Sequence, residues 1–148
     1  MASKSPIPLA TLGANPEVAK QIQALLLPEY DLVHICLTPT QAVAELPPLC
    51  AGALDTPDSS GLGSNAALPA GERRVPRGII FGGGVGDEDL ERVMRAVRER
   101  VPEEDGGVKV VRVTREDVLA KGATGPSAGV IGEVLREKLA GLVQRGEL

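Results

Sequence analysis

Aromatic side chains are nearly missing from this sequence, which holds one tyrosine, one phenylalanine and no tryptophan among 148 residues. A hydrophobic core must therefore be built from Leu, Val, Ile and Ala, and the hydrophobic content of 43% is sufficient for one. Sites that hold bases, sugars or flavins by stacking need aromatic platforms, so the composition disfavours those classes. The length suits one core, and we expect residues 1–148 to form a single domain.

Clusters of basic residues and long apolar runs are also absent. The formal net charge is −4, with Lys and Arg mixed among acids, so neither nucleic acid nor a membrane is expected as a partner. No run of about 18 apolar residues exists, and no segment is predicted to span a bilayer. The opening residues MASKSPIPLATLG lack the continuous apolar region of a signal peptide, which predicts a cytoplasmic location, with the nucleus as the alternative.

Cysteine and histidine are scarce too. Cys36 and Cys50 show no metal-ligand spacing, and without an export signal both are expected to be buried, reduced thiols. His34, the single histidine, lies in an apolar run and is predicted to be a buried, hydrogen-bonded or packed residue rather than a catalytic base. A His34–Cys36 dyad is disfavoured because side chains in the middle of a sheet rarely reach a substrate. The sequence therefore predicts no metal site and no cofactor.

What the chain does contain is a regular alternation of apolar strands and amphipathic helices. Two helices open with a capping residue followed by proline, at Asn15 and at Thr38, and Pro47 and Pro48 are predicted to end the second of them early. Strands are expected at 7–13, 31–37, 77–83 and 108–114, and helices at 15–27, 38–50, 87–101, 114–122 and 126–146.

This alternation predicts an α/β protein in which helices cover both faces of a parallel sheet. Right-handed crossovers then lead to a three-layer, doubly wound sandwich with four parallel strands in the order 2-1-3-4, Rossmann-like or flavodoxin-like. Residues 51–76 interrupt the pattern, because they are rich in Gly, Ser, Pro and Ala and have no period. We predict that this segment is a long, flexible insertion that is dispensable for ligand binding.

In such sheets ligands bind beyond the carboxyl ends of the strands, at the point where the strand order reverses. Here this point lies between the first and third strands, and the glycines at their ends are expected to adopt positive φ and to leave room for a ligand. The residues predicted to line this crevice are Gly13, Ala14, Asn15, Thr38, Gly82, Gly83, Gly84, Asp87 and Thr114.

The glycines at 82–86 and the following acids allow three interpretations. They form a glycine turn that leads into a helix, a ligand site whose acids contact sugar hydroxyls, or an Mg²⁺ site. A phosphate site is disfavoured because the dinucleotide-binding glycine spacing fails and no Walker Lys-Ser pair is present. Asp87, Glu88 and Asp89 would also repel a phosphate, so we expect no tight NAD(P) binding.

Three resemblances accompany these patterns. TLGANPEVAKQI resembles the start of extended, atypical short-chain NAD(P)-binding proteins, matching their fingerprint at Gly13 but departing from it at Asn15 and Pro16. The topology resembles bacterial receiver domains, with Thr114 at their hydroxyl position, but glycines replace the phospho-accepting Asp and the fifth strand is missing, so phosphotransfer is not expected. LLPEYDLVH, SSGLGSNAA and PRGIIFGGG resemble a group of small uncharacterised proteins from filamentous fungi, which implies no activity.

Two functional hypotheses follow. The first is a non-catalytic domain that binds a small molecule or a partner at the crevice. The second is a small enzyme, such as an atypical NAD(P)-dependent reductase, whose catalytic residues come from the strand ends. Its candidate residues are Asn15, Thr38, Asp87, Thr114 and Ser127. No acid, base and nucleophile can be matched from the sequence, which favours the first hypothesis. The last helix is the expected interface of a homodimer.

Overall fold

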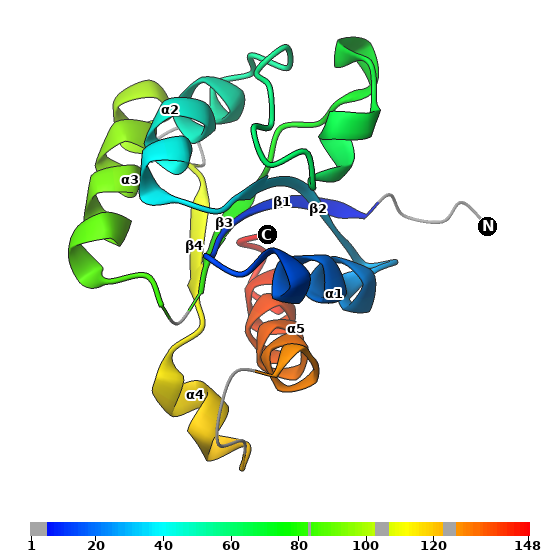
Figure 1. The fold of residues 1–148 in the computed structure, drawn as a ribbon, viewed down its shortest axis with the longest axis vertical. Helices are drawn as coiled ribbons and strands as arrows, with labels where there is room; N and C mark the ends of the chain where they lie inside the picture. Colours follow the sequence, from blue (N-terminus) through cyan, green and yellow to red (C-terminus); the bar gives the residue numbers. More distant parts are fainter. Residues whose placement is uncertain (1–5, 83, 103–106, 123–126) are drawn as a thin grey trace.

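A computed structural model describes residues 6–82, 84–102, 107–122 and 127–148. One sheet holds four parallel strands in the order β2-β1-β3-β4. Helices α1 and α5 cover one face of this sheet, and α2 and α3 cover the other (Figure 1). The predicted three-layer α/β sandwich and its strand order are confirmed. The strands are β1 (Ile7–Leu12), β2 (Tyr30–Cys36), β3 (Gly78–Phe81) and β4 (Lys109–Arg112).

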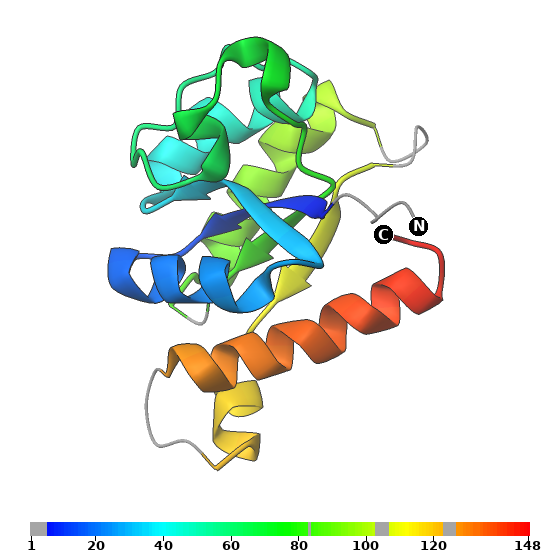
Figure 2. The ribbon, with the colours of Figure 1, turned by 90° about the vertical axis from the view of Figure 1, so that its right-hand side faces the viewer.

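The helices follow the strands in the order that the sequence predicts. Figure 2 shows α1 and α5 on one side of the sheet, with α2, α3 and the 51–76 segment on the other. In the described ranges, no helix combines the length and the apolar character needed to cross a bilayer. The helices are α1 (Pro16–Leu26), α2 (Pro39–Cys50), α3 (Asp87–Arg100), α4 (Arg115–Ala120) and α5 (Ala128–Gln144).

Helix α2 does not end early at its two prolines, contrary to the prediction. It continues through Pro47 and Pro48 to Cys50, although each proline lacks the N–H of a helical hydrogen bond. Leu46 and Leu49 are fully buried in its last turns, where α2 packs along α3. Burial of one leucine side chain contributes about 1.5–3 kcal/mol, so this packing offsets the lost hydrogen bonds.

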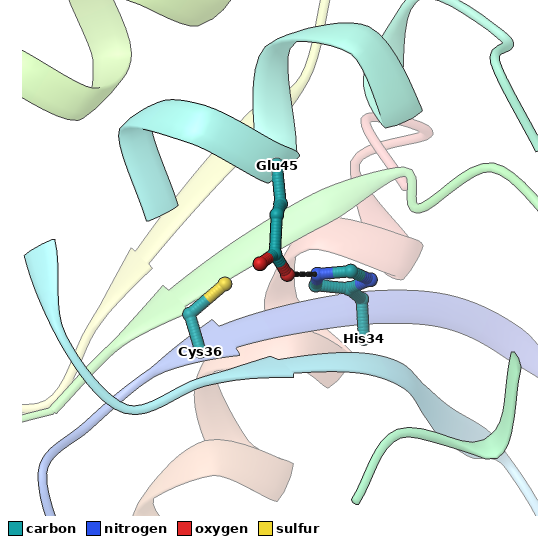
Figure 3. A group of neighbouring side chains, drawn as sticks. All are labelled: His34, Cys36 and Glu45. Carbon is teal, nitrogen blue, oxygen red and sulfur yellow. Dashed lines mark hydrogen bonds and ion pairs between the residues drawn. The ribbon is translucent and has the colours of Figure 1, made fainter. Parts of the chain in front are cut away.

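A bulge in β2 decides which side chains face α2. Leu9 lies opposite Leu32, but the next residue of β1, Ala10, lies opposite His34, so Val33 is an extra residue in β2. Leu32 packs into the core beneath α1 and α5. Beyond the bulge the alternation is reset, and His34 and Cys36 point toward α2 (Figure 3).

The 51–76 segment, expected to be a flexible insertion, contains two short 3-10 helices, at Ser64–Ala67 and Ala70–Glu72. It packs against the outer edge of β2 through polar side chains. The Asp58 carboxylate accepts the backbone N–H of Ile35 at 3.0 Å, and the Ser60 hydroxyl donates to the Ile35 carbonyl at 2.7 Å. These hydrogen bonds join the segment to an edge strand without apolar side chains, and its flexibility stays a prediction.

Candidate ligand-binding crevice

A cavity of about 260 Å³ opens at the carboxyl ends of β1 and β3, on the sheet face that α1 and α5 cover. This is the point where the strand order reverses. Helix α1 forms one wall and the first half of α5 forms another. The residues that line the cavity are Thr11, Leu12, Gly13, Ala14, Asn15, Val18, Ala19, Ile22, Leu32, Ile80, Gly82, Gly84, Val113, Ile131 and Leu135.

The residues that the sequence assigns to the crevice divide into three groups. Gly13, Ala14, Asn15, Gly82 and Gly84 line the cavity, where their part in binding stays a prediction. Gly83 lies outside the described residues. The remaining three are not among the lining residues, and they are Thr38, Asp87 and Thr114.

These three residues stabilise helices instead. The Thr38 hydroxyl accepts the backbone N–H of Gln41 at 3.1 Å and caps α2. Thr114 forms a capping box with Asp117 at the start of α4. Asp87, in the first turn of α3, pairs with Arg112 of β4. Topology places the ends of all the strands at one edge of the sheet, but it does not determine which side chains reach the cavity.

Two polar side chains, Thr11 and Asn15, line the cavity, and the oxygen of each is hydrogen-bonded. The Thr11 hydroxyl donates to the Ile80 carbonyl at 3.1 Å. The Asn15 side-chain oxygen accepts two backbone N–H groups of α1, at 3.0 and 3.2 Å. None of the described lining residues carries an ionisable side chain. The cavity therefore presents an apolar surface to a ligand.

The expectation that the crevice glycines adopt positive φ is wrong for those that the structure describes. Among the described glycines, positive φ occurs at positions outside the crevice. A Cβ atom added to Gly13 or Gly84 would meet nothing within 4 Å. These glycines widen the crevice mouth because they lack side chains, not because the backbone requires glycine there.

The residues considered for catalysis do not converge. Asn15, Thr38 and Thr114 cap helices, and the Ser127 hydroxyl accepts the Val130 N–H at 3.5 Å at the start of α5. The side chain of each is thus committed to its own helix. These described candidates therefore do not bring an acid, a base and a nucleophile together at the crevice.

A cluster of polar side chains lies between α2 and β2, on the sheet face opposite the cavity. His34 Nε2 is 2.8 Å from Glu45 Oε1, and both residues are buried (Figure 3). His34 is thus the buried, hydrogen-bonded residue that the sequence predicts, but its carboxylate partner was missed. The signal was available, since Ala42, Glu45 and Leu49 share the inward face of α2.

Cys36 also belongs to this cluster. Burial, and then the charge of the neighbouring Glu45, raises the pKa of the Cys36 thiol. Burial likewise raises the pKa of Cys50 to about 12. Both thiols are free and buried, as the sequence predicts, and neither has the lowered pKa of a catalytic nucleophile.

The cluster under α2 also contains three side chains of the kinds that bind metal ions. Among the described residues, one group of three potential ligands comes close together, and it is His34, Cys36 and Glu45 rather than the acidic turn at 87–89. Comparisons with models of known protein families, with curated proteins and with solved structures found no match.

Proposed function

We propose that the protein is a non-catalytic binding domain that holds a small, uncharged, apolar molecule in the crevice between β1, β3, α1 and α5. The observation that supports this proposal most is the lining of the 260 Å³ cavity, in which the described residues carry no ionisable side chain. Apolar surface removed from water contributes about 25 cal/mol per Å², so such a cavity favours apolar ligands.

The same lining disfavours charged ligands. A nucleotide or sugar phosphate entering this cavity would lose its hydration without gaining a cationic partner, which is costly. The first turn of α3, next to the end of β3, carries Asp87, Glu88 and Asp89 and would repel an anion. An NAD(P)-dependent reductase at the same strand ends remains the second hypothesis, with less support.

The proposal is tested by methyl NMR with p-xylene as the probe. Ile22, Ile80 and Ile131 line the cavity, whereas Ile79 lies on the opposite face of the sheet. We expect p-xylene to shift the methyl signals of the three lining isoleucines and to leave Ile79 unchanged. Shifts centred on Ile79, or no shifts at all, would contradict the proposal.

Two matched variants of α1 sharpen this test. Ala19 is buried and lines the cavity, whereas Ala24 is exposed on the same helix. Ala19→Leu fills part of the cavity and is expected to weaken p-xylene binding by more than about tenfold, or 1.4 kcal/mol. Ala24→Leu is expected to bind like the wild type. Equal binding by both variants would place the site elsewhere, and NADPH serves as the charged probe that is expected not to bind.

A further inference from the structure

Three metal-ligating side chains meet in the layer between β2 and α2. His34 and Cys36 stand two residues apart on β2 beyond the bulge, so both point to the same face. The Glu45 side chain extends from α2 toward both of them (Figure 3). The nitrogen, sulfur and oxygen ligand atoms all lie within 4.8 Å of one another.

This cluster is unusual because of its burial. His34 and Cys36 are 0% exposed and Glu45 is 7% exposed. A buried carboxylate is costly unless it is paired and hydrogen-bonded. Glu45 Oε1 lies 2.8 Å from His34 Nε2 and accepts from the Gln41 side chain at 3.1 Å and from the Ser59 backbone at 3.2 Å. The acid therefore contacts β2, α2 and the 51–76 segment, and its Oε1 atom is directed at the imidazole (Figure 3).

Only one of the two nitrogen atoms of the His34 imidazole has a hydrogen-bond partner among the described residues. His34 Nδ1 is buried and has no hydrogen-bond partner among the described residues. With the ring proton on Nδ1, the Nε2 lone pair is available to an ion, whose coordination by Nε2 and Glu45 would replace the hydrogen bond between them. A neutral imidazole with a free Nε2 lone pair is the form that binds metal ions.

We propose that His34 Nε2, Cys36 Sγ and the Glu45 carboxylate bind one divalent ion of the Zn²⁺ class. Imidazole nitrogen, thiolate sulfur and carboxylate oxygen are the ligands that Zn²⁺ takes in proteins, at about 2.0–2.3 Å. Binding releases the thiol proton of Cys36 to solvent, and the charges of the ion, thiolate and carboxylate then sum to zero. A neutral assembly suits a buried position better than an isolated carboxylate does.

The site would also join three parts of the fold. Its ligands come from β2 and α2, and the Ser59 hydroxyl of the 51–76 segment donates to the second oxygen of Glu45. Three protein ligands leave one position of a tetrahedral ion for water or for this hydroxyl. The role is structural and independent of the proposed apolar crevice, which lies on the other face of the sheet.

Cobalt spectroscopy on the full chain tests the proposal. The protein is stripped with a chelator, kept reduced with a phosphine and titrated with Co²⁺. We expect one equivalent to produce a thiolate-to-cobalt charge-transfer band, which Zn²⁺ then removes by displacement. A folded wild type that shows no such band overturns the proposal.

The two cysteines supply a matched pair of variants. Cys36→Ser is expected to lose the band, and Cys50→Ser is expected to keep it at the same stoichiometry. Glu45→Gln is expected to weaken Co²⁺ binding by more than about tenfold, since even outer partners of metal ligands contribute about 10–100-fold. A band that persists in Cys36→Ser overturns the proposal.

Folding failure of one variant does not leave the question open. The chain has two cysteines, so Cys50→Ser holds Cys36 as its single thiol. A band in that variant comes from Cys36, and its absence from folded Cys50→Ser refutes the site even if Cys36→Ser does not fold.

Discussion

Gly63 lies where the 51–76 segment crosses the bulged part of β2. A Cβ atom at this position would lie 2.3 Å from the Val33 carbonyl oxygen and 2.6 Å from His34 Cα. Both neighbours belong to the backbone of a sheet strand and cannot move aside cheaply. The close approach of two backbones, rather than a positive φ, is what requires glycine here.

We predict that Gly63→Ala lowers the free energy of unfolding by about 1–3 kcal/mol, the range for overpacking a tight site. Gly71 is the matched control, because it lies in the same segment and an added Cβ would meet nothing within 4 Å. Gly71→Ala is expected to change stability by less than about 0.5 kcal/mol. Urea unfolding measures both, and equal effects would show that the segment does not pack on β2 as described.

Asp117 supplies a prediction about pH. The backbone N–H of Thr114, and then the Lys138 ammonium, lower the pKa of the Asp117 carboxyl from 3.8 to about 2. Because the folded-state pKa is the lower one, this carboxylate stabilises the fold above about pH 4, and its contribution disappears as the pH falls toward 2.

Asp117→Asn should therefore be less stable than the wild type at neutral pH, and this difference should shrink steadily as the pH falls from about 4 to about 2. Thermal unfolding across that pH range measures the difference. Asp55→Asn, at an exposed position in the 51–76 segment, controls for the loss of one negative charge. A difference that is independent of pH would contradict the capping-box explanation.

The outer edge of β2 is hydrogen-bonded to side chains rather than to a neighbouring strand. The Asp58 carboxylate accepts the backbone N–H of Ile35 and of Gly63, each at 3.0 Å. Since β2 is an edge strand, the Ile35 amide has no neighbouring strand on that side. A carboxylate thus takes the place of a fifth strand and blocks edge-to-edge association.

Asp58→Ala is expected to destabilise the protein by about 1–3 kcal/mol, because it leaves buried amide groups without acceptors. Hydrogen exchange should accelerate at Ile35 more than at Ile80, which lies in the central strand β3. Asp55→Ala is the control from the same segment. Unchanged protection of Ile35 in Asp58→Ala would show that another group caps this edge.

At the scale of the whole molecule, the two faces of the sheet carry separate properties. The apolar cavity belongs to the α1–α5 face, and the 51–76 segment packs around β2 beside α2. Replacement of Thr56–Gly71 by a Gly-Ser linker should lower stability and expose the β2 edge, so that light scattering detects self-association. Binding of p-xylene should persist in the monomeric fraction. Loss of binding with an unchanged melting temperature would place the segment over the crevice.

The homodimer through α5 stays a prediction for the same light-scattering measurement on the wild type. Much of the apolar stripe of α5 is used within the chain, since Leu135 and Leu139 are fully buried. Val143, by contrast, is 41% exposed on this helix. A dimer that Val143→Asp dissociates would support this interface, and a monomeric wild type would contradict it.

The order of the elements, the parallel sheet and the place where its strand order reverses could all be predicted from the amino-acid sequence. These properties follow from local signals: apolar periodicity, capping residues such as Asn15 and Thr38, and the handedness of crossovers. The location of a crevice at the ends of β1 and β3 follows in turn from that order.

Which side chains contact one another could not be predicted in this way. The bulge at Val33, the pairing of His34 with Glu45 and the anchoring of residues 51–76 by Asp58 all depend on contacts between separate elements. Helix α2 passes through two prolines because burial against α3 outweighs a local preference. Local patterns carry no information about such contacts, since their energies arise when distant segments pack together.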